Sequence, residues 1–158
     1  MGNEVIFDEL DKKILGLITN NARISFLEVA RICNVSGAAV HQRVQKMTTG
    51  NIITGSEFTL NSSKIGYNTC AFVKLNFSHT HNLDEMVLKL KEIPEIVECH
   101  HTTGNCDLLV KIYTKNNAHL HQIIQTRIKP LGLESSESVI SFNEPFRRQL
   151  NLSKLITK

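Results

Sequence analysis

Apolar residues recur at helical spacing three times before Gly50. Asp8, Ser25 and Ser36 stand where these three segments begin, and all are residue types that cap helices. Glu28, three residues after Ser25, would complete a capping box. The pattern predicts three helices, the second and third joined by a short turn as in a helix-turn-helix unit, with Gly50 as a left-handed C-cap. The apolar stripes are Leu10, Ile14, Leu17 and Ile18, then Phe26, Val29, Ala30 and Cys33, then Val40, Val44 and Met47.

The pattern is less regular after the third segment. Residues 51–60 read as a strand interrupted at Gly55, which would be either a short wing or the first leg of a connector. Residues 61–66, rich in Asn, Ser and Gly, are the most linker-like part of the chain. We therefore expect a helix-turn-helix domain with its connector strand at 1–60, a linker at 61–66 and a second domain at 67–158.

Alternation of apolar and polar residues dominates the second half of the chain. The predicted strands are residues 70–77, 96–103, 107–113 and 135–143. Two amphipathic helices lie between them, with the stripes Leu83, Met86, Val87 and Leu90, and Leu120, Ile123, Ile124 and Ile128. The order βαββαβ is the ferredoxin-like arrangement, an antiparallel sheet with both helices on one face, so the fold class is α+β. The other face, which includes Cys70 and Phe72, needs a cover, and a second copy of the chain is the expected one.

The outer face of the third predicted helix points to DNA. Its outermost residues are small near the start and then glutamine, a side chain that pairs well with adenine. No acidic residue occurs between Val29 and Ser56, where three basic residues give a local charge of +3. Arg43 and Lys46 lie on the flanks of the face, where phosphates are the nearer target. An ordinary αα-hairpin is the competing interpretation. The candidate DNA-contacting residues are Ser25, Ser36, Gly37, Ala38, His41, Gln42, Arg43, Gln45 and Lys46.

Composition narrows the function classes. The chain has 158 residues, a net charge of +3 and 41% hydrophobic residues, enough for a core. No segment resembles a signal peptide or reaches membrane-spanning length, so we expect a cytoplasmic protein without a membrane partner. The four cysteines lack CxxC spacing and are expected to be reduced thiols.

The seven histidines raise the question of a metal site. His100 and His101 lie beside Cys99 and Cys106, and zinc accepts such ligands, but a strand would turn His100 away from its neighbours. The His79/His81 and His119/His121 pairs are spaced i, i+2, which separates their side chains on a helix. No nucleophile–base spacing and no glycine-rich phosphate loop is present. We expect no metal, no cofactor and no enzymatic activity.

The chain resembles the leucine-responsive regulator/AsnC (Lrp/AsnC) family of transcription factors over nearly its whole length. The resemblance is carried by FDELDKKIL, ARISFLEVA, NVSGAAVHQRVQKMTTGNI, KIGYNTCAFVKLNF and ECHHTTGNCDLLVKI. It implies that the head binds DNA and that the tail assembles the oligomer and senses small effectors, commonly amino acids. The chain departs from the family pattern in three places. Cys106 replaces an aromatic residue, Thr48 replaces a glutamate, and the outer face of the third helix is rich in glutamine rather than arginine.

The resemblance also suggests an effector site at the predicted turn of residues 102–107. Asp107, at the end of the family's GxxD turn, would accept hydrogen bonds from an α-ammonium group, and Gly104 would let a carboxylate approach the backbone. A plain hairpin turn, with Asp107 capping backbone amides, is the alternative. The candidate effector residues are Thr103, Gly104, Asn105, Cys106, Asp107, Asn117, Ser136 and Ser138.

The functional expectation is therefore a sequence-specific DNA-binding transcriptional regulator, modulated by a small effector that binds between C-terminal domains. Its expected partners are double-stranded DNA, an amino acid, and further copies of the chain in a homodimer or a larger oligomer such as an octamer. The alternative is an oligomeric small-molecule or metal sensor whose helical head docks protein rather than DNA.

Overall fold

The computed structural model describes residues 8–78 and 82–150, which form two compact units. Of these, residues 8–59 and 146–150 belong to the helical head, and residues 60–78 and 82–145 belong to the sheet domain. The sequence placed everything after residue 66 in the second domain. The difference arises because the chain returns to the head after its last strand. Within the described residues, no helix combines the length and the apolar character needed to cross a bilayer.

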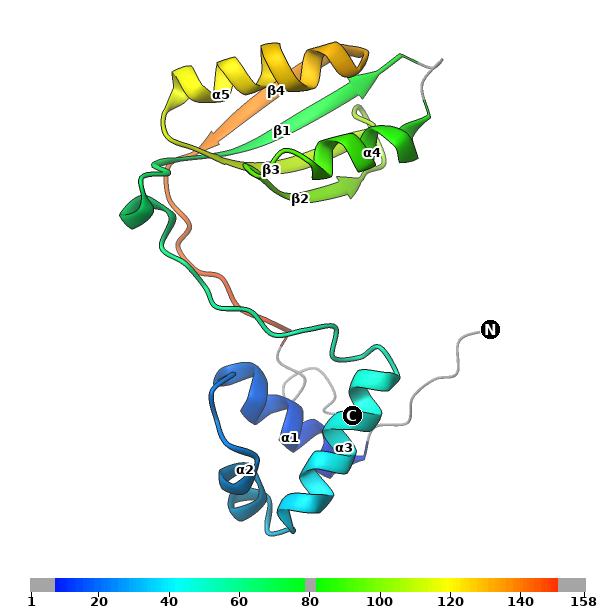
Figure 1. Cartoon of the computed structure of the whole chain (residues 1–158), viewed down its shortest axis with the longest axis vertical. Coiled ribbons are helices and arrows are strands. Elements are labelled where there is room, and N and C mark those ends of the chain that lie inside the picture. The colour runs from blue at the N-terminus through cyan, green and yellow to red at the C-terminus, as the bar shows by residue number, and fades with distance from the viewer. Residues whose placement is uncertain (1–7, 79–81, 151–158) are drawn as a thin grey trace. The chain divides into compact units, whose positions relative to one another are not determined.

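Three helices build the head, as Figure 1 shows: α1 (Glu9–Asn20), α2 (Phe26–Cys33) and α3 (Gly37–Thr49). The helix-turn-helix prediction is confirmed. Phe26 departs from its predicted stripe, because it is 38% exposed at the first position of α2 and its ring meets that of His41 edge to face. Leu15, outside the predicted stripe, is buried instead. The buried core of the head is Ile14, Leu15, Val29, Ala30, Val40 and Met47.

The helix ends follow cap chemistry with two departures. Ser25 Oγ accepts from the Glu28 amide at 3.1 Å, but the capping box predicted there is not completed among the described residues. A complete capping box forms at α1, between Asp8 and Asp11. Gly50 is not left-handed, since its φ is −77°. Asn51 takes that role with φ 59°. The turn falls one residue late because the Gly50 amide still donates to Lys46 O, at 2.9 Å.

The stretch between the units differs from its prediction. Residues 51–61, called the connector below, contain no strand, so of the two predicted alternatives the wing is not formed. The linker-like stretch is an ordered 3₁₀ turn, Ser62–Ile65. Asn61 caps this turn by accepting from the Lys64 amide, and Gly66 ends it with φ 91°.

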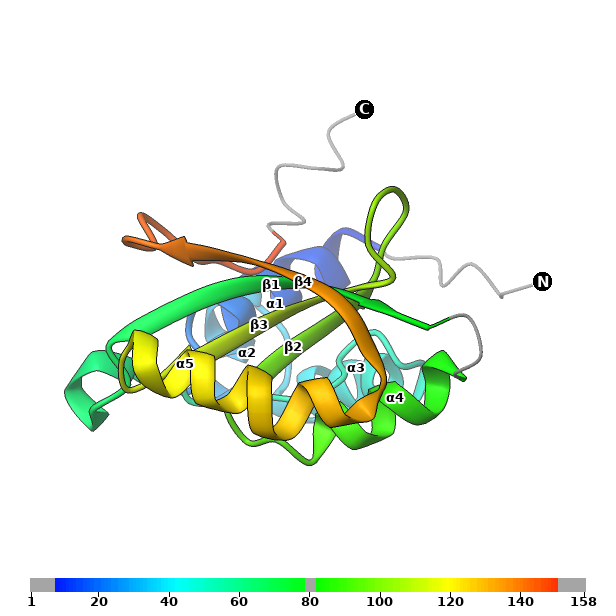
Figure 2. The same ribbon diagram turned by 90° about the horizontal axis from the view of Figure 1, so that it is seen from above.

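The sheet domain confirms the ferredoxin-like order. Its strands are β1 (Thr69–Phe77), β2 (Ile96–His101), β3 (Leu108–Thr114) and β4 (Leu133–Ser141). They form one antiparallel sheet in the order β2-β3-β1-β4. Helices α4 (Leu83–Lys91) and α5 (Asn117–Ile123) cover the same face, as Figure 2 shows. A π turn (Ile124–Ile128) and a 3₁₀ turn (Lys129–Leu131) prolong α5 up to Gly132, whose φ is 89°.

The core of the sheet domain lies between the sheet and its two helices. The period-two pattern of β1 puts alternate side chains on this side, where they are at most 3% exposed. Side chains from α4, β3 and the α5 region complete the layer. The β1 members are Ala71, Val73, Leu75 and Phe77, and the others include Met86, Leu90, Leu108, Val110, Ile123 and Ile128.

One side chain of α3 fastens it to the start of α1. The Nη1 atom of Arg43 lies 2.5 Å from Asp8 Oδ2 and 2.8 Å from Asp11 Oδ1. The hydrogen bond from the Asp11 amide and the guanidinium of Arg43 together lower the pKa of Asp8. Arg43 therefore stabilises the packing of α3 against the capping box.

We predict that Arg43→Gln lowers the melting temperature of the head at neutral pH. A carboxyl whose folded pKa is depressed stabilises the fold above its unfolded pKa, about 3.9 for Asp, and loses that contribution as pH falls through the folded pKa. The gap between wild type and variant should therefore close on acidification below about pH 4. Circular dichroism melts over a pH series test this, with Arg31→Gln as control, since Arg31 forms no ion pair among the described residues. A gap independent of pH would contradict the ion-pair explanation.

Candidate nucleic-acid interface and ligand turn

The exposed face of α3 carries polar and small side chains without acidic groups. Ala38, Gln42, Gln45, Lys46 and Thr49 are exposed. On the opposite side of the helix, Val40 and Met47 are buried and Val44 packs against the same core. This division follows from the turn of 100° per residue, which separates the apolar stripe from the glutamines. The face offers amide donors and acceptors suited to base edges and a cation suited to phosphate.

The first turn of α3 has features that favour the binding of an anion. Ser36 Oγ accepts from the Ala39 amide at 3.1 Å, which leaves the hydroxyl proton of Ser36 able to donate. The amides of Gly37 and Ala38 open the helix and have no acceptor within it. No acidic residue lies in this turn, whereas the first turn of α2 contains Glu28. The start of α3 is thus the more favourable of the two helix starts for a phosphate.

Two of the predicted contact residues have partners inside the head. Arg43 is engaged by Asp8 and Asp11, a structural role that the sequence did not predict, and a phosphate contact would require it to give up these ion pairs. His41 is exposed and its ring centroid lies 6.0 Å from that of Phe26. The spacing of Asp8 and Asp11 indicates that the two carboxylates can share one cation. Nothing in the sequence indicated that Arg43 would be that cation.

The turn between β2 and β3 is held by its own side chains. Gly104 has φ 110°, as a residue without a Cβ permits. Thr102 Oγ1 donates to Cys106 O at 2.9 Å and lies 3.1 Å from Cys106 Sγ. Thr103, Gly104 and Asn105 remain exposed at the tip. Whether the backbone amides of this exposed tip meet a ligand stays a prediction.

Asp107 is partly committed to the fold. Its Oδ2 accepts from the Phe77 amide at 2.9 Å, and its own amide donates to Leu75 O at 3.1 Å. This is the capping role that the alternative interpretation assigned to it. Oδ1 accepts no hydrogen bond from the described residues.

Asn76, which the sequence pattern did not single out, organises the same region. Its Nδ2 donates to Asn105 O at 3.3 Å and to Ser135 Oγ at 3.1 Å, and its Oδ1 accepts from the Asp107 amide at 3.2 Å. Asn76 thereby joins the turn, β1 and β4. The available signal was an asparagine, a poor strand former, between two buried strand residues.

The other predicted effector residues do not meet the turn within one chain. Asn117 accepts from Thr69 Oγ1 at 3.3 Å, at the start of β1, whereas the turn lies beside Leu75. Six residues of strand separate these points, about 20 Å. Ser136 and Ser138 pair with Leu75 and Val73, and therefore lie on the face that the helices cover. An effector pocket that includes all the predicted residues would require a neighbouring subunit.

The open face of the sheet has a lysine at its centre. Lys111 is 6% exposed, and its Nζ lies 3.3 Å from Glu144 Oε1 and 3.5 Å from Glu98 Oε1. It also lies 5.8 Å from the ring centroid of Phe72 and 5.5 Å from that of Tyr113. Burial alone would lower the pKa of Lys111, but the Glu144 hydrogen bond and the Glu98 charge outweigh it and raise the pKa. Burial raises the pKa of the neighbouring Cys70 and Tyr113 as well.

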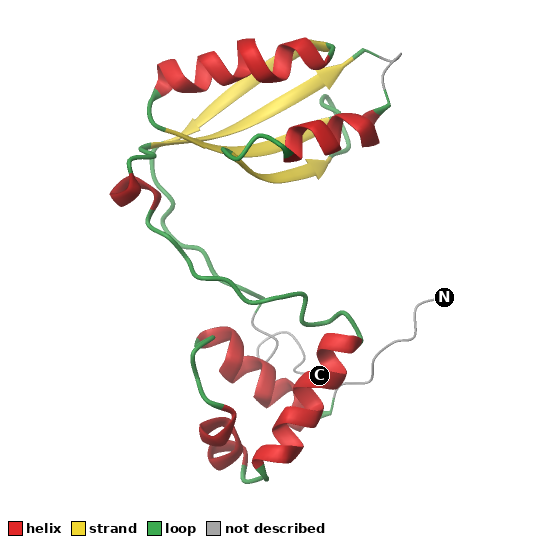
Figure 3. Ribbon diagram, in the orientation of Figure 1, coloured by secondary structure: helices red, strands yellow, loops and turns green. Residues whose placement is uncertain are grey.

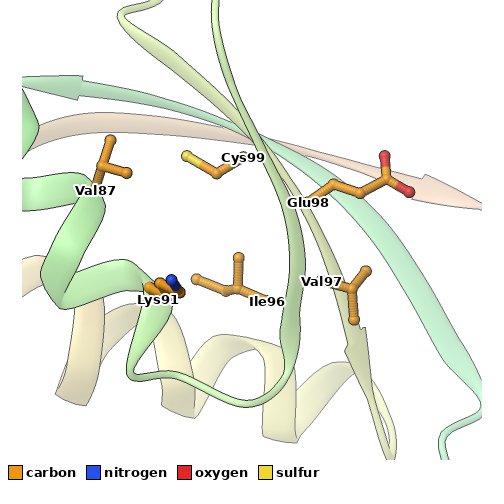
Figure 4. A pocket seen from close by; sticks show the side chains of 6 residues that line it. All are labelled: Val87, Lys91, Ile96, Val97, Glu98 and Cys99. Carbon is orange, nitrogen blue, oxygen red and sulfur yellow. The ribbon is translucent and has the colours of Figure 1, made fainter. Parts of the chain in front are cut away.

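A shallow hollow lies between α4 and β2 (Figure 4). Val87 and Lys91 of α4 face Ile96 and Cys99 of β2 across it, whereas the Glu98 carboxylate points away. Burial raises the pKa of Cys99, which leaves its thiol a weak nucleophile and metal ligand. Because Lys91 is the one charged side chain on the inner side of the hollow, the hollow offers little to orient a ligand.

The histidines do not converge. His100 lies 3.5 Å from Glu98, and His119 lies 3.8 Å from Glu95. The described part of the chain contains no group of three or more His, Cys, Asp or Glu side chains able to hold a metal. The predicted pair His79/His81 lies outside the described residues.

Comparison with known proteins identifies both units. Residues 7–48 match the AsnC-type helix-turn-helix domain, and residues 70–150 match the Lrp/AsnC ligand binding domain. Regulatory protein AsnC of Haemophilus influenzae is 33% identical over 144 residues, which are 90% of this chain and 96% of that protein.

Solved structures agree with the domain matches. The structure of Escherichia coli AsnC has a TM-score of 0.84 and 26% identity, and the match covers 92% of this chain and 99% of that one. A Neisseria meningitidis transcriptional regulator in complex with L-Met shares the fold, with a TM-score of 0.88 at 18% identity over 96% of this chain and 100% of that one.

The head and the sheet domain therefore each have a counterpart in one family, in the same order along the chain. The members that match are transcriptional regulators and not enzymes. The chain belongs to the Lrp/AsnC family of helix-turn-helix transcriptional regulators with a ligand-binding domain.

Proposed function

We propose that this regulator reads a specific DNA sequence through Gln42 and Gln45 of α3. The observation that carries the proposal is the exposed, acid-free face of α3, whose glutamines lie opposite the buried Val40 and Met47. In this arrangement Gln42 and Gln45 contact base edges, with adenine as the preferred partner. Lys46 and the first turn of α3, from Ser36 to Ala38, hold phosphates. His41 is exposed on α3, and Ser25 caps the start of α2.

We predict that Gln42→Ala weakens binding to the preferred duplex by about 1–3 kcal/mol and leaves random DNA nearly unaffected. Lys46→Ala should weaken both duplexes and reduce the salt slope by about 1. Fluorescence anisotropy titrations at several salt concentrations measure both effects. Gln122→Ala, which changes an exposed glutamine of α5 in the sheet domain, serves as the matched control. Equal losses of Gln42→Ala on both duplexes would show that α3 does not read bases.

We further propose that the effector is an amino acid bound at the turn of residues 103–107. Two features support this: the exposed amides at the tip suit a carboxylate, and Asp107 Oδ1 suits an ammonium group. The L-Met in the Neisseria meningitidis structure is an amino acid held by a protein of the same fold. Asn117, Ser136 and Ser138 would line the site from a neighbouring subunit. Occupancy at such a subunit boundary would bias the assembly and hence the heads. Cys106, which is smaller than an aromatic residue, leaves room for a larger side chain on the ligand.

We predict that one of the twenty amino acids raises the melting temperature of the wild type, because a ligand of the native state stabilises it. Calorimetry with that amino acid on Asp107→Asn should show an affinity loss of about tenfold or more. The asparagine keeps an oxygen for the Phe77 amide and removes the charge, so a folding defect is separated from a binding defect. Asn105→Asp, which alters charge at the exposed tip, tests whether any nearby charge change suffices. Unchanged affinity in Asp107→Asn would place the site elsewhere.

We also propose that a second copy of the chain covers the open face of the sheet. Phe72 is 36% exposed and Val139 is 49% exposed on neighbouring strands, paired directly across the sheet. An isologous contact between two such faces buries the apolar side chains of both copies. A dimer of this kind carries two heads, which would recognise half-sites separated by about one helical turn or a multiple of it.

We predict that Val139→Lys shifts the full-length protein toward monomer in sedimentation velocity, because it places a charge in a face that the dimer buries. Leu88→Lys is the control, since Leu88 is similarly exposed but lies on α4, away from the open face. A Val139→Lys protein with the sedimentation coefficient of the wild type would refute this arrangement.

A further inference from the structure

The segment after β4 runs back beside the connector (Figure 3), and we call it the C-terminal leg, residues 142–150. Two ion pairs hold it. Glu144 Oε1 lies 3.3 Å from Lys111 Nζ in the sheet domain, and Arg147 Nη2 lies 3.3 Å from Glu57 Oε1 in the head unit. We propose that the C-terminal leg is a second link between the sheet domain and the head, with Arg147 as a positioning residue for the DNA-binding head. The inference rests on the proposed DNA-binding function.

The anchor in the sheet domain is the ion pair between Glu144 and Lys111, which several neighbouring groups support. Lys111 is nearly buried, lies near the rings of Phe72 and Tyr113, and faces a second carboxylate at Glu98. A partly desolvated ion pair is screened less by water and salt than one at the surface. Ser141 Oγ, which donates to Asn143 O at 3.0 Å, shapes the chain just before Glu144. The start of the leg is therefore held to the face of the sheet.

The anchor in the head unit combines two contacts. Glu57 of the connector forms an ion pair with Arg147. The guanidinium of Arg23 lies over the ring of the next residue, Phe58, with its Cζ atom 4.8 Å from the ring centroid. Arg23 belongs to the turn between α1 and α2. The connector is thus fastened to the head by Arg23, and the C-terminal leg is fastened to the connector by Arg147. An exposed ion pair alone is weak, so this anchor depends on both contacts.

The length of chain between the anchors makes the link short. Glu144 and Arg147 are three residues apart, which an extended chain spans in about 11 Å at most. A head attached through the connector alone would turn about every free backbone dihedral of that segment. A second attachment closes a loop and removes part of that freedom. Two heads in a dimer would then face DNA at a restricted spacing, which is what recognition of paired half-sites needs.

Charge reversal tests the second anchor in the intact protein. Thermolysin cuts before large apolar residues, and Leu60 of the connector is exposed. Arg147→Glu should speed cleavage of the Thr59–Leu60 bond by about two- to fivefold. The expected change in rate is small because an exposed ion pair contributes little free energy. The double variant Glu57→Arg with Arg147→Glu should restore the wild-type rate, and Arg147→Lys should nearly retain it. Arg148→Glu, which changes the neighbouring arginine, should leave the rate unchanged. Equal rates in all variants would overturn the proposal.

A cross-link tests whether the anchor joins segments of one chain. Cysteines at positions 57 and 147, in a background with Cys33, Cys70, Cys99 and Cys106 replaced by serine, are treated with a short bis-maleimide. The link requires a product that migrates as a cross-linked monomer in denaturing electrophoresis. A product of twice the chain mass would show that the leg belongs to a second copy, which would overturn a link within the chain.

The DNA readout separates this inference from the proposed function. Arg147→Glu should keep the wild-type affinity for a duplex with one selected half-site and lose affinity for a duplex with two. A purely structural defect would weaken both. Wild-type protein that binds neither duplex would refute the proposed function, yet the cleavage and cross-linking results would still decide whether the leg is a second link. Equal losses on both duplexes would overturn the positioning role of Arg147.

Discussion

The two faces of β1 determine what the sheet domain can do. The strand lies between β3 and β4, so each of its side chains has neighbours on both sides. Leu75 and the other β1 residues at alternate positions build the core under the helices. Phe72, Lys74 and Asn76, one position out of phase, face the other way, and there they set the exposed apolar patch, an ion pair with Glu137 and the network around the turn. A shift in register by one residue would exchange these roles and destroy both faces.

The same constraint explains why so much of the fold is readable from the sequence. Helical and strand periodicity are local properties, so the pattern of Ile14, Val73 or Met86 identifies an element without knowledge of its neighbours. The irregular segments were harder. Residues 51–60 have the composition of a strand, but a strand requires a hydrogen-bonded partner, and composition does not report whether one exists. Gly50 is the C-cap of α3 but is not left-handed, because its amide still donates to Lys46 O and the left-handed residue is Asn51.

The candidate site was predictable only where its chemistry is local. The exposed glutamines of α3 follow from helix geometry, and the position of the turn at Gly104 follows from its residue types. Pairings across the chain leave no periodic signal. Arg43 finds Asp8 across 35 positions, and Asn76 finds Asp107 across 31. These partners give the residues roles within the fold: Arg43 is held by two carboxylates of the head, and Asp107 accepts from the Phe77 amide with one oxygen.

The internal pairing of Arg43 also governs how the regulator would search a genome. Each phosphate contact contributes about −0.9 to the slope of log affinity against log salt. With Arg43 withheld, Lys46 and Arg31 are the exposed cations of the acid-free stretch, so one head holds the polyanion through few charges. The head would then dissociate quickly from random DNA, and such nonspecific contacts would add little to its affinity for an isolated half-site. In the proposed dimer, occupancy would come instead from two heads engaged at once, through the high effective concentration of the second after the first has bound. Such a dimer would respond to the number of half-sites in the DNA as well as to their sequence.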